Sequence, residues 1–270
     1  MNIPPDRSTW QARLVLLVGI LVVFGTAHAV GDPASAAPRL STGRNTPPRP
    51  DTHLRPETIP PVLSACEFDY PPFSVVTAQG KADGFSVELL QAALEAVGRE
   101  VIFRTGTWPE IRSWLETEQV EVLPLVARAP EREALFDFTV PYMSLHGAIV
   151  VRKGSQGIRH VDDLAGKQVA VMKGDSAEEF LREKKPDIRL HTTDSFATAL
   201  RELSAGQHDA VVMQRLVAVR LIQDHQLTGL EIIGQSVDGF VQEFCFAVPE
   251  GHSRMLALLN EGLALVIADG

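Results

Sequence analysis

The residues best suited to catalysis or metal binding are spaced in a way that favours neither. The two cysteines, Cys66 and Cys245, do not form the Cys-x-x-Cys spacing of zinc and redox sites. The eight histidines include no i, i+4 pair that would place two imidazoles on one face of a helix. The chain also lacks Gly-x-Ser-x-Gly, His-Glu-x-x-His and a glycine-rich phosphate loop. We therefore expect no enzyme activity, no metal and no cofactor.

The charge balance argues against polyanionic partners. The 270-residue chain carries 25 Lys and Arg against 34 Asp and Glu, a net charge of −9. Such a chain repels phosphate backbones and anionic lipid headgroups, so we expect no nucleic-acid partner. The composition, 45% hydrophobic and 22% charged, is typical of a globular protein. The length is enough for one or two domains.

The first 60 residues predict export. Two arginines precede the uncharged run 14–25, and Ala27-His28-Ala29 follows it, which is the layout of a signal peptide over residues 1–29. An uncleaved anchor reaching Val30 is the alternative. Residues 30–60 are rich in proline and predict a linker. We expect the remainder in the periplasm, free or tethered to the inner membrane. A disulfide is permitted there, but both cysteines lie in apolar runs, so we expect two separate buried thiols.

Short apolar runs alternate with helix-period segments from residue 61 onward, which predicts an α/β fold with largely parallel sheets. Ser86 and Ser253 are expected to cap helices, and Thr107 and Glu110 have the spacing of a capping box. Two series of elements, before and after residue 148, predict two α/β lobes with separate sheets. Expected strands are 62–66, 101–103, 120–125, 148–151, 168–172, 188–191, 209–213, 230–233 and 243–248, and expected helices are 86–97, 107–115, 194–205, 216–224, 253–267 and one opening at 174.

Five segments, taken in order, carry a resemblance to a known family. They are Asp69-Tyr70-Pro71-Pro72-Phe73, residues 83–90, Ala129-Pro130-Glu131-Arg132, residues 136–142 and residues 162–167. Together they resemble the type II periplasmic solute-binding fold, the flytrap fold of the bacterial extracellular solute-binding proteins, family 3. The resemblance implies two lobes joined by two hinge crossings, with the ligand between them. Lobe 1 would comprise residues 61–147 plus 247–270, and lobe 2 residues 148–246.

The resemblance also implies a set of ligand-binding residues. Tyr70 and Trp108 fall where amino-acid binders place aromatic rings against the ligand. Arg132 falls at the arginine that takes the ligand's α-carboxylate, a role suited to its planar, bidentate guanidinium. Lobe 2 would contribute Asp175 and Ser176 at a helix start, and Gln214 at a strand end.

Departures from the amino-acid-binding pattern bear on the ligand. Leu125 and Ala127 replace hydroxyl residues, and Gln214 replaces the acidic residue for the ligand's ammonium group. Asp175 would face a carboxylate unless it turns inward as the helix cap. Arg128 adds a second candidate cation, which leaves room for a dicarboxylate. We therefore expect a small polar or anionic ligand, either amino-acid-like or an organic anion, and an ordinary α-amino acid is disfavoured.

With these departures, the sequence is more similar to the periplasmic sensor domains of histidine kinases and diguanylate cyclases. Residues 212–217, 244–248 and 259–263 add to this similarity. The expected function is therefore the ligand-sensing input module of a membrane signalling protein, with a kinase or cyclase module following in the full-length protein. The alternative is a soluble binding protein that serves the permease of an ABC amino-acid importer. A flytrap-fold dehydratase is a remote alternative.

Overall fold

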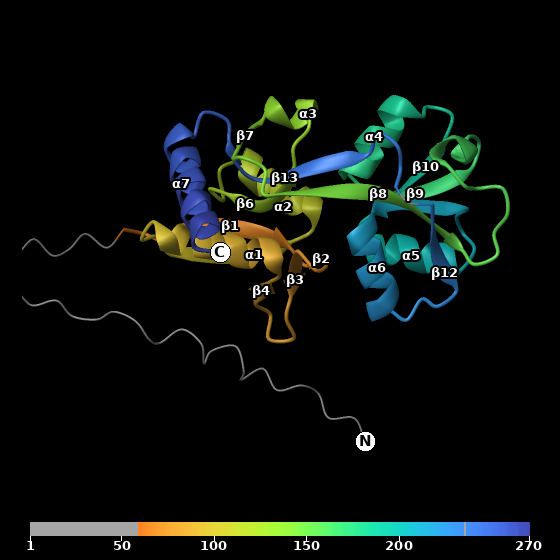
Figure 1. The fold of residues 1–270 in the computed structure, drawn as a ribbon, viewed down its shortest axis with the longest axis horizontal. Coiled ribbons are helices and arrows are strands. Elements are labelled where there is room, and N and C mark those ends of the chain that lie inside the picture. Colours follow the sequence, from red (N-terminus) through yellow and green to blue (C-terminus); the bar gives the residue numbers. More distant parts are fainter. Residues whose placement is uncertain (1–58, 235) are drawn as a thin grey trace, which may run out of the picture. The chain divides into compact units, whose positions relative to one another are not determined.

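The computed structural model describes residues 59–270, apart from residue 235. All of them belong to one compact unit, Arg55–Gly270. The predicted signal segment 1–29 and all but the last two residues of the predicted linker 30–60 lie outside the described residues. Helices and strands alternate in a mixed α/β fold (Figure 1). We keep the names lobe 1 and lobe 2 for the predicted ranges, and that division remains a prediction.

Lobe 1 is built on the parallel pair β1 and β5, in which Val62 lies opposite Val101. Helices α1 and α7 pack together beside this pair, and Leu90 and Leu263 are fully buried between them. A Cβ on Gly262 of α7 would lie 2.1 Å from the carbonyl oxygen of Ala93, so this close helix contact requires a glycine. The elements are β1 (Val62–Glu67), β2 (Asp69–Tyr70), β3 (Ser74–Val76), β4 (Ala82–Asp83), α1 (Phe85–Ala96), β5 (Val101–Gly106), α2 (Trp108–Glu116), β6 (Leu123–Ala127), α3 (Pro130–Glu133), β7 (Phe136–Phe138) and α7 (Ser253–Asp269).

Lobe 2 has helices on both faces of its sheet. In strand β9, Val169 and Val171 belong to the same hydrophobic cluster as Leu181 of α4, whereas Ala170 packs in the cluster of α5 and α6. This alternation is what a strand buried on both faces requires. The elements are a 3-10 helix (Val161–Leu164), β9 (Gln168–Met172), α4 (Ser176–Lys184), β10 (Arg189–Thr193), α5 (Phe196–Ser204), β11 (Ala210–Gln214), α6 (Arg215–Asp224) and β12 (Leu230–Ile233).

Two long strands, β8 (Met143–Arg152) and β13 (Val241–Pro249), run between the lobes (Figure 1). They pair with each other over residues 143–146 and 241–244. Beyond that segment β8 pairs with β11 and β12, and β13 pairs with β6 and β7. The hydrogen-bonded order β10-β9-β11-β8-β13-β6 is therefore continuous, and the expectation of separate sheets is wrong. Each strand is long enough to pair on both sides of the crossing.

The ends of the helices differ in part from the sequence prediction. The capping box is confirmed, because the Glu110 carboxylate accepts a hydrogen bond of 2.8 Å from the backbone N–H of Thr107. Ser86 does not cap α1, which begins after Gly84; the Ser86 hydroxyl is buried and contacts the Tyr142 hydroxyl at 2.9 Å. Ser253 is the first residue of α7 rather than its cap.

Both cysteines are free and buried, which confirms two separate thiols. Burial raises the pKa of Cys66 to about 11 and that of Cys245 to about 12. Both side chains therefore stay as thiols at neutral pH. Among the helices of residues 59–270, none combines the length and the apolar character that a membrane span needs.

Candidate functional site

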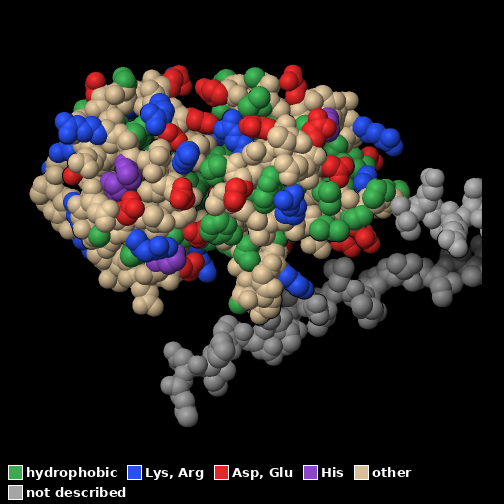
Figure 2. Space-filling model, turned by 180° about the vertical axis from the view of Figure 1, so that it is seen from behind, with side chains coloured by type: hydrophobic (Ala, Val, Ile, Leu, Met, Phe, Trp, Pro, Cys, Tyr) green, Lys and Arg blue, Asp and Glu red, His purple; other side chains and the backbone are tan. Residues whose placement is uncertain are grey.

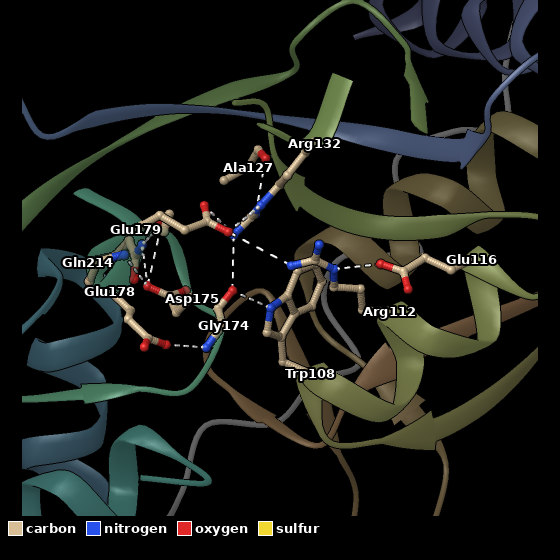
Figure 3. A network of polar contacts seen from close by, with 12 residues as sticks. Trp108, Arg112, Glu116, Ala127, Arg132, Gly174, Asp175, Glu178, Glu179 and Gln214 are labelled. Atoms are coloured by element: carbon tan, nitrogen blue, oxygen red, sulfur yellow. Dashed lines mark hydrogen bonds and ion pairs between the residues drawn. The ribbon is translucent and has the colours of Figure 1, made fainter. Parts of the chain in front are cut away.

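The structure brings the six predicted site residues together where the two lobes meet. Tyr70 lies on β2, Trp108 opens α2, and Arg132 lies on α3. Asp175 and Ser176 lie at the start of α4, and Gln214 ends β11. All six side chains are buried, and Gln214 is 0% exposed. Figure 3 shows most of this group, with contacts that cross from one lobe to the other.

Gly174 is one of the points at which lobe 2 touches lobe 1. Its carbonyl oxygen accepts hydrogen bonds from Trp108 Nε1 at 2.7 Å and from Arg132 Nη2 at 3.2 Å (Figure 3). Gly174 has φ +72°, and a Cβ at this position would lie 3.4 Å from Trp108 Nε1. The left-handed backbone favours glycine here, whereas the space beside Trp108 would admit a Cβ. The two lobe 1 side chains also contact each other, with Arg132 Cζ 5.1 Å from the Trp108 ring centroid.

Arg132 is 2% exposed and is held from both sides. Its Nη1 donates to the Ala127 carbonyl at 3.1 Å within lobe 1. Its Nη2 lies 3.0 Å from Glu179 Oε2 on α4 of lobe 2, and its Nε lies 3.4 Å from the other carboxylate oxygen. Glu179 was not predicted as a site residue. The guanidinium expected to take a ligand's carboxylate thus pairs with a carboxylate of the protein itself.

Asp175, Ser176 and Gln214 form a second polar group on the lobe 2 side. Asp175 caps α4 by accepting a hydrogen bond of 2.8 Å from the backbone N–H of Ala177. Gln214 Nε2 donates to the Ser176 hydroxyl at 2.9 Å and lies 3.5 Å from Asp175 Oδ1. Burial raises the pKa of Asp175, and the hydrogen bond from Ala177 opposes that shift. Gln214 Oε1 is buried without a hydrogen-bond partner among the described residues.

Glu67 is a further acidic residue of the site. It ends β1, is buried, and lies close enough to Asp175, Asp69 and Arg132 to feel their charges. Burial, and then the Asp175 and Asp69 carboxylates, raise the pKa of Glu67 to about 8, and Arg132 opposes this shift. The Tyr70 hydroxyl nearby is buried and has no hydrogen-bond partner among residues 59–270.

The space between the lobes is small. A cavity of about 10 Å³ lies there, lined from both lobes, which is roughly the space for one water molecule. Its lining residues are Glu67, Phe68, Asp69, Gly106, Thr107, Trp108, Met172, Asp194 and Ser195. A larger hollow of about 820 Å³ elsewhere on lobe 2, beside Phe180 and Lys185, contains none of the six site residues. The polar residues therefore indicate the interlobe site as the candidate site, whereas cavity volume alone would favour the hollow on lobe 2.

A family model for bacterial extracellular solute-binding proteins, family 3, matches residues 63–270. The chain belongs to this family. It is 31% identical over 211 residues to the L-cystine-binding protein TcyJ of Escherichia coli (strain K12), covering 77% of this chain and 78% of that protein. It is 30% identical over 210 residues to the putative ABC transporter arginine-binding protein 2 of the same strain, covering 76% and 85%. These relatives are binding proteins, not enzymes.

Solved structures of two kinds share the type II periplasmic-binding-protein fold with this family member. One is a histidine kinase sensor domain with similarity to periplasmic binding proteins, at TM-score 0.74 and 32% identity, covering 78% of this chain and 91% of that chain. Another is an ancestral arginine-binding protein bound to arginine, at TM-score 0.72 and 30% identity, covering 77% and 93%. The fold and the family predicted from the sequence are confirmed.

One predicted cation of this family member lies outside the site. Arg128 is half exposed and pairs with Glu133 on the surface, with 2.6 Å between Nε and Oε1. The interlobe site therefore has Arg132 facing the acidic side chains of Glu67, Asp175 and Glu179. This balance removes the argument for a dicarboxylate. Glu67 had a usable sequence signal, since it directly follows the predicted strand 62–66, at the carboxyl end where ligands bind in α/β sheets. Glu179 had no such signal.

Proposed function

We propose that this protein binds a small amino-acid-like solute between its lobes and delivers it to the permease of an ABC importer. The observation that carries the proposal is one buried arginine, Arg132, among the buried carboxyl groups of Glu67 and Asp175. A ligand with one carboxylate and one or more ammonium or guanidinium groups complements this set. The names of the curated relatives, which bind cystine or arginine, support the same class.

Each polar group of such a ligand has a partner in the site. The ligand's carboxylate would take Arg132 in place of Glu179. Its cationic group would lie against the carboxyl groups of Asp175 and Glu67. The Tyr70 hydroxyl and Gln214 Oε1, which have no hydrogen-bond partner among the described residues, supply one further donor and one acceptor. Because the interlobe cavity is only about 10 Å³, the lobes must separate to admit an amino acid.

Calorimetry on the full chain tests the ligand class. We expect binding of arginine, lysine, glutamine or cystine, and none of malate or succinate. Arg132→Ala should lower the affinity for the bound amino acid about 10- to 100-fold, since a charge-assisted hydrogen bond is worth roughly 1.5–3 kcal/mol. Arg128→Ala is the matched control, because that arginine pairs with Glu133 on the surface and should leave affinity unchanged.

Two results would contradict the ligand assignment. The first is tighter binding of a dicarboxylate than of any amino acid, which would mean that the acidic groups of the site do not pair with a cationic group of the ligand. The second is equal affinity of wild type and Arg132→Ala for the bound ligand, which would place the ligand elsewhere.

A ligand-sensing input module of a membrane signalling protein is the second candidate. The similarity to a histidine kinase sensor domain supports it. Deleting the gene in its source organism separates the two roles. If the protein is an importer component, the deletion strain should lose uptake of the radiolabelled ligand. If it is a sensor, the strain should keep normal uptake and lose a transcriptional response to the ligand.

We propose a periplasmic location, supported by the membership in a family of extracellular proteins. Cleavage of the predicted signal segment 1–29 provides a test of this location. Cell fractionation followed by N-terminal sequencing should find the protein outside the cytoplasm, with a new terminus close after Ala29. A full-length protein in the membrane fraction would instead indicate the uncleaved anchor.

A further inference from the structure

Lobe 2 carries a cluster of two histidines and a glutamate outside the interlobe site. His191 lies on β10, Glu202 on α5, and His208 directly before β11. One side-chain ligand atom from each lies within 4.8 Å of the other two. Figure 2 shows histidine side chains at the surface of the half that contains lobe 2, beside acidic side chains.

The Glu202 carboxylate is the centre of the cluster. Its Oε2 lies 2.9 Å from His208 Nε2 and 4.0 Å from His191 Nε2. The two imidazole rings lie almost side by side, with 4.8 Å between centroids and 32° between planes. Two ring nitrogens and a carboxylate oxygen thus converge from three different elements.

The backbone holds two of these residues firmly. His191 lies opposite Ala170 in the parallel pair of β10 with β9. The Arg152 guanidinium donates to the backbone carbonyls of Leu203 and His208, which joins the end of α5 to the segment that precedes β11. His208 is 5% exposed, whereas the His191 side chain is 58% exposed and has room to rotate.

We propose that His191, Glu202 and His208 bind one divalent transition-metal ion, with Zn²⁺ as the expected metal. Two imidazoles and one carboxylate are a common ligand set for zinc with a fourth position open to solvent. Ligand bonds of about 2.0–2.2 Å in a tetrahedron place the ligand atoms roughly 3.4 Å apart. To reach that spacing, His191 Nε2 must approach Glu202 Oε2 from its present 4.0 Å, for which its exposed side chain has room, and the 2.9 Å pair of His208 Nε2 and Glu202 Oε2 must open by about 0.5 Å.

The sequence did not indicate this site, because its ligands come from a strand, a helix and a connecting segment. His191 and His208 are 17 positions apart in the sequence, far from the i, i+4 spacing of a helical metal motif. The proposal does not rest on the proposed function, since none of the three residues belongs to the interlobe site.

Isothermal titration of the untagged, chelator-treated full chain with ZnCl₂ tests the proposal. We expect one ion per chain with a micromolar or tighter Kd. His191→Ala and Glu202→Gln should each weaken binding by more than the roughly 10- to 100-fold that changes beyond the direct ligands cost. Zinc at a hundredfold excess over Kd should raise the Tm of the wild type by about 5–10 °C, with no such rise in the variants.

The matched control is His252→Ala. His252 Nε2 lies 3.8 Å from Glu118 Oε2, a histidine–carboxylate pair that is not part of a three-ligand cluster among the described residues. This variant should bind zinc as the wild type does. His191 is exposed enough that its replacement leaves the core intact, which circular dichroism checks. The proposal is overturned if the wild type takes up no zinc at 100 µM, or if His191→Ala and Glu202→Gln bind it with unchanged Kd.

Discussion

At the scale of single residues, the pair of Arg132 with Glu179 matters most for affinity. Glu179 holds the guanidinium that we assign to the ligand's carboxylate, so it competes with the ligand for the same partner. Arg112 lies 3.9 Å from Glu179 as well and remains a partner for it when Arg132 is taken. The exchange of one carboxylate for another lowers the net gain from ligand binding.

Glu179→Gln should therefore tighten ligand binding, by about threefold to tenfold. The amide holds Arg132 less strongly than the carboxylate does, and tenfold corresponds to about 1.4 kcal/mol. Calorimetry with the amino acid that the wild type binds measures the effect. Glu183→Gln, an exposed glutamate on the same helix, is the control. Weaker binding by Glu179→Gln would mean that this carboxylate contacts the ligand rather than competing with it.

Glu67 makes stability depend on pH. Its pKa rises from an ordinary 4.5 to about 8 in the folded protein, so the folded state keeps a proton that the unfolded chain has lost. The contribution of Glu67 to the free energy of unfolding should therefore be fully present below about pH 4.5 and be lost as the pH rises through 8. Glu67→Gln should abolish this part of the dependence and be the more stable protein at pH 8.5, by on the order of a few kcal/mol.

Urea unfolding at pH 5, 7 and 8.5 measures the Glu67 effect. Glu133→Gln serves as the control, since that carboxylate is half exposed. Parallel pH profiles for wild type and Glu67→Gln would show that Glu67 ionises as an ordinary surface carboxylate does.

The six residues predicted from the sequence lie together at the lobe boundary, and Glu67 and Glu179 lie there without having been predicted; their role in binding remains a prediction. Tyr70, Trp108 and Arg132 lie in segments with a recognisable local pattern. Glu179 becomes a site residue only because its carboxylate on α4 lies 3.0 Å from Arg132 Nη2 across the lobe boundary, and no local pattern encodes such a contact. Arg128 shows the reverse case, because its neighbour Glu133 holds it at the surface.

At the scale of elements, hydrophobic periodicity placed the buried parts of strands and missed their polar ends. The strand predicted at 148–151 extends over Met143–Arg152, because Ser144 and His146 pair with β13 while lying partly exposed. The short strands β2, β3 and β4 follow from hydrogen bonding around the turn at Pro71-Pro72 and have too few apolar residues to be recognised. Helices, with longer apolar faces, were placed to within about two residues.

The contact of α1 with α7 gives a test of packing. Gly262→Ala places a methyl group against the Ala93 backbone, and relieving that overlap must push the two helices apart. We expect a loss of about 1–3 kcal/mol in the free energy of unfolding. Gly229→Ala is the control, since a Cβ there has nothing within 4 Å and should change stability little. Equal unfolding midpoints for the two variants would show that α7 can shift without cost.

At the scale of the whole molecule, the side-chain polar contacts that join the lobes within residues 59–270 centre on Gly174 and Glu179. Trp108 and Arg132 both bind the Gly174 carbonyl, and Arg132 also binds Glu179. A ligand changes the populations of separated and joined lobes only through its different affinity for the two states. The direct contacts between the lobes therefore determine how much binding free energy the ligand must supply to hold the lobes together.

Trp108→Phe should shift the unbound protein toward separated lobes. It keeps an aromatic ring but removes the 2.7 Å hydrogen bond to Gly174. We expect a larger radius of gyration by small-angle scattering without ligand, and a return to the wild-type value with saturating amino acid. Trp114→Phe, whose ring stacks on Arg104 within lobe 1, is the control. Identical scattering from Trp108→Phe and wild type would show that this hydrogen bond does not hold the lobes.

The pairing of β8 with β13 has a mechanical consequence. Two separate loops would let one lobe turn about any axis, but a hydrogen-bonded two-stranded ribbon bends easily only out of its own plane. Shearing it or bending it within its plane breaks ladder hydrogen bonds at roughly 1 kcal/mol each. The backbone thereby restricts lobe motion to a single soft direction. We therefore expect Arg132 and the first turn of α4 to meet in the same alignment each time the lobes close, whatever path the ligand takes to enter.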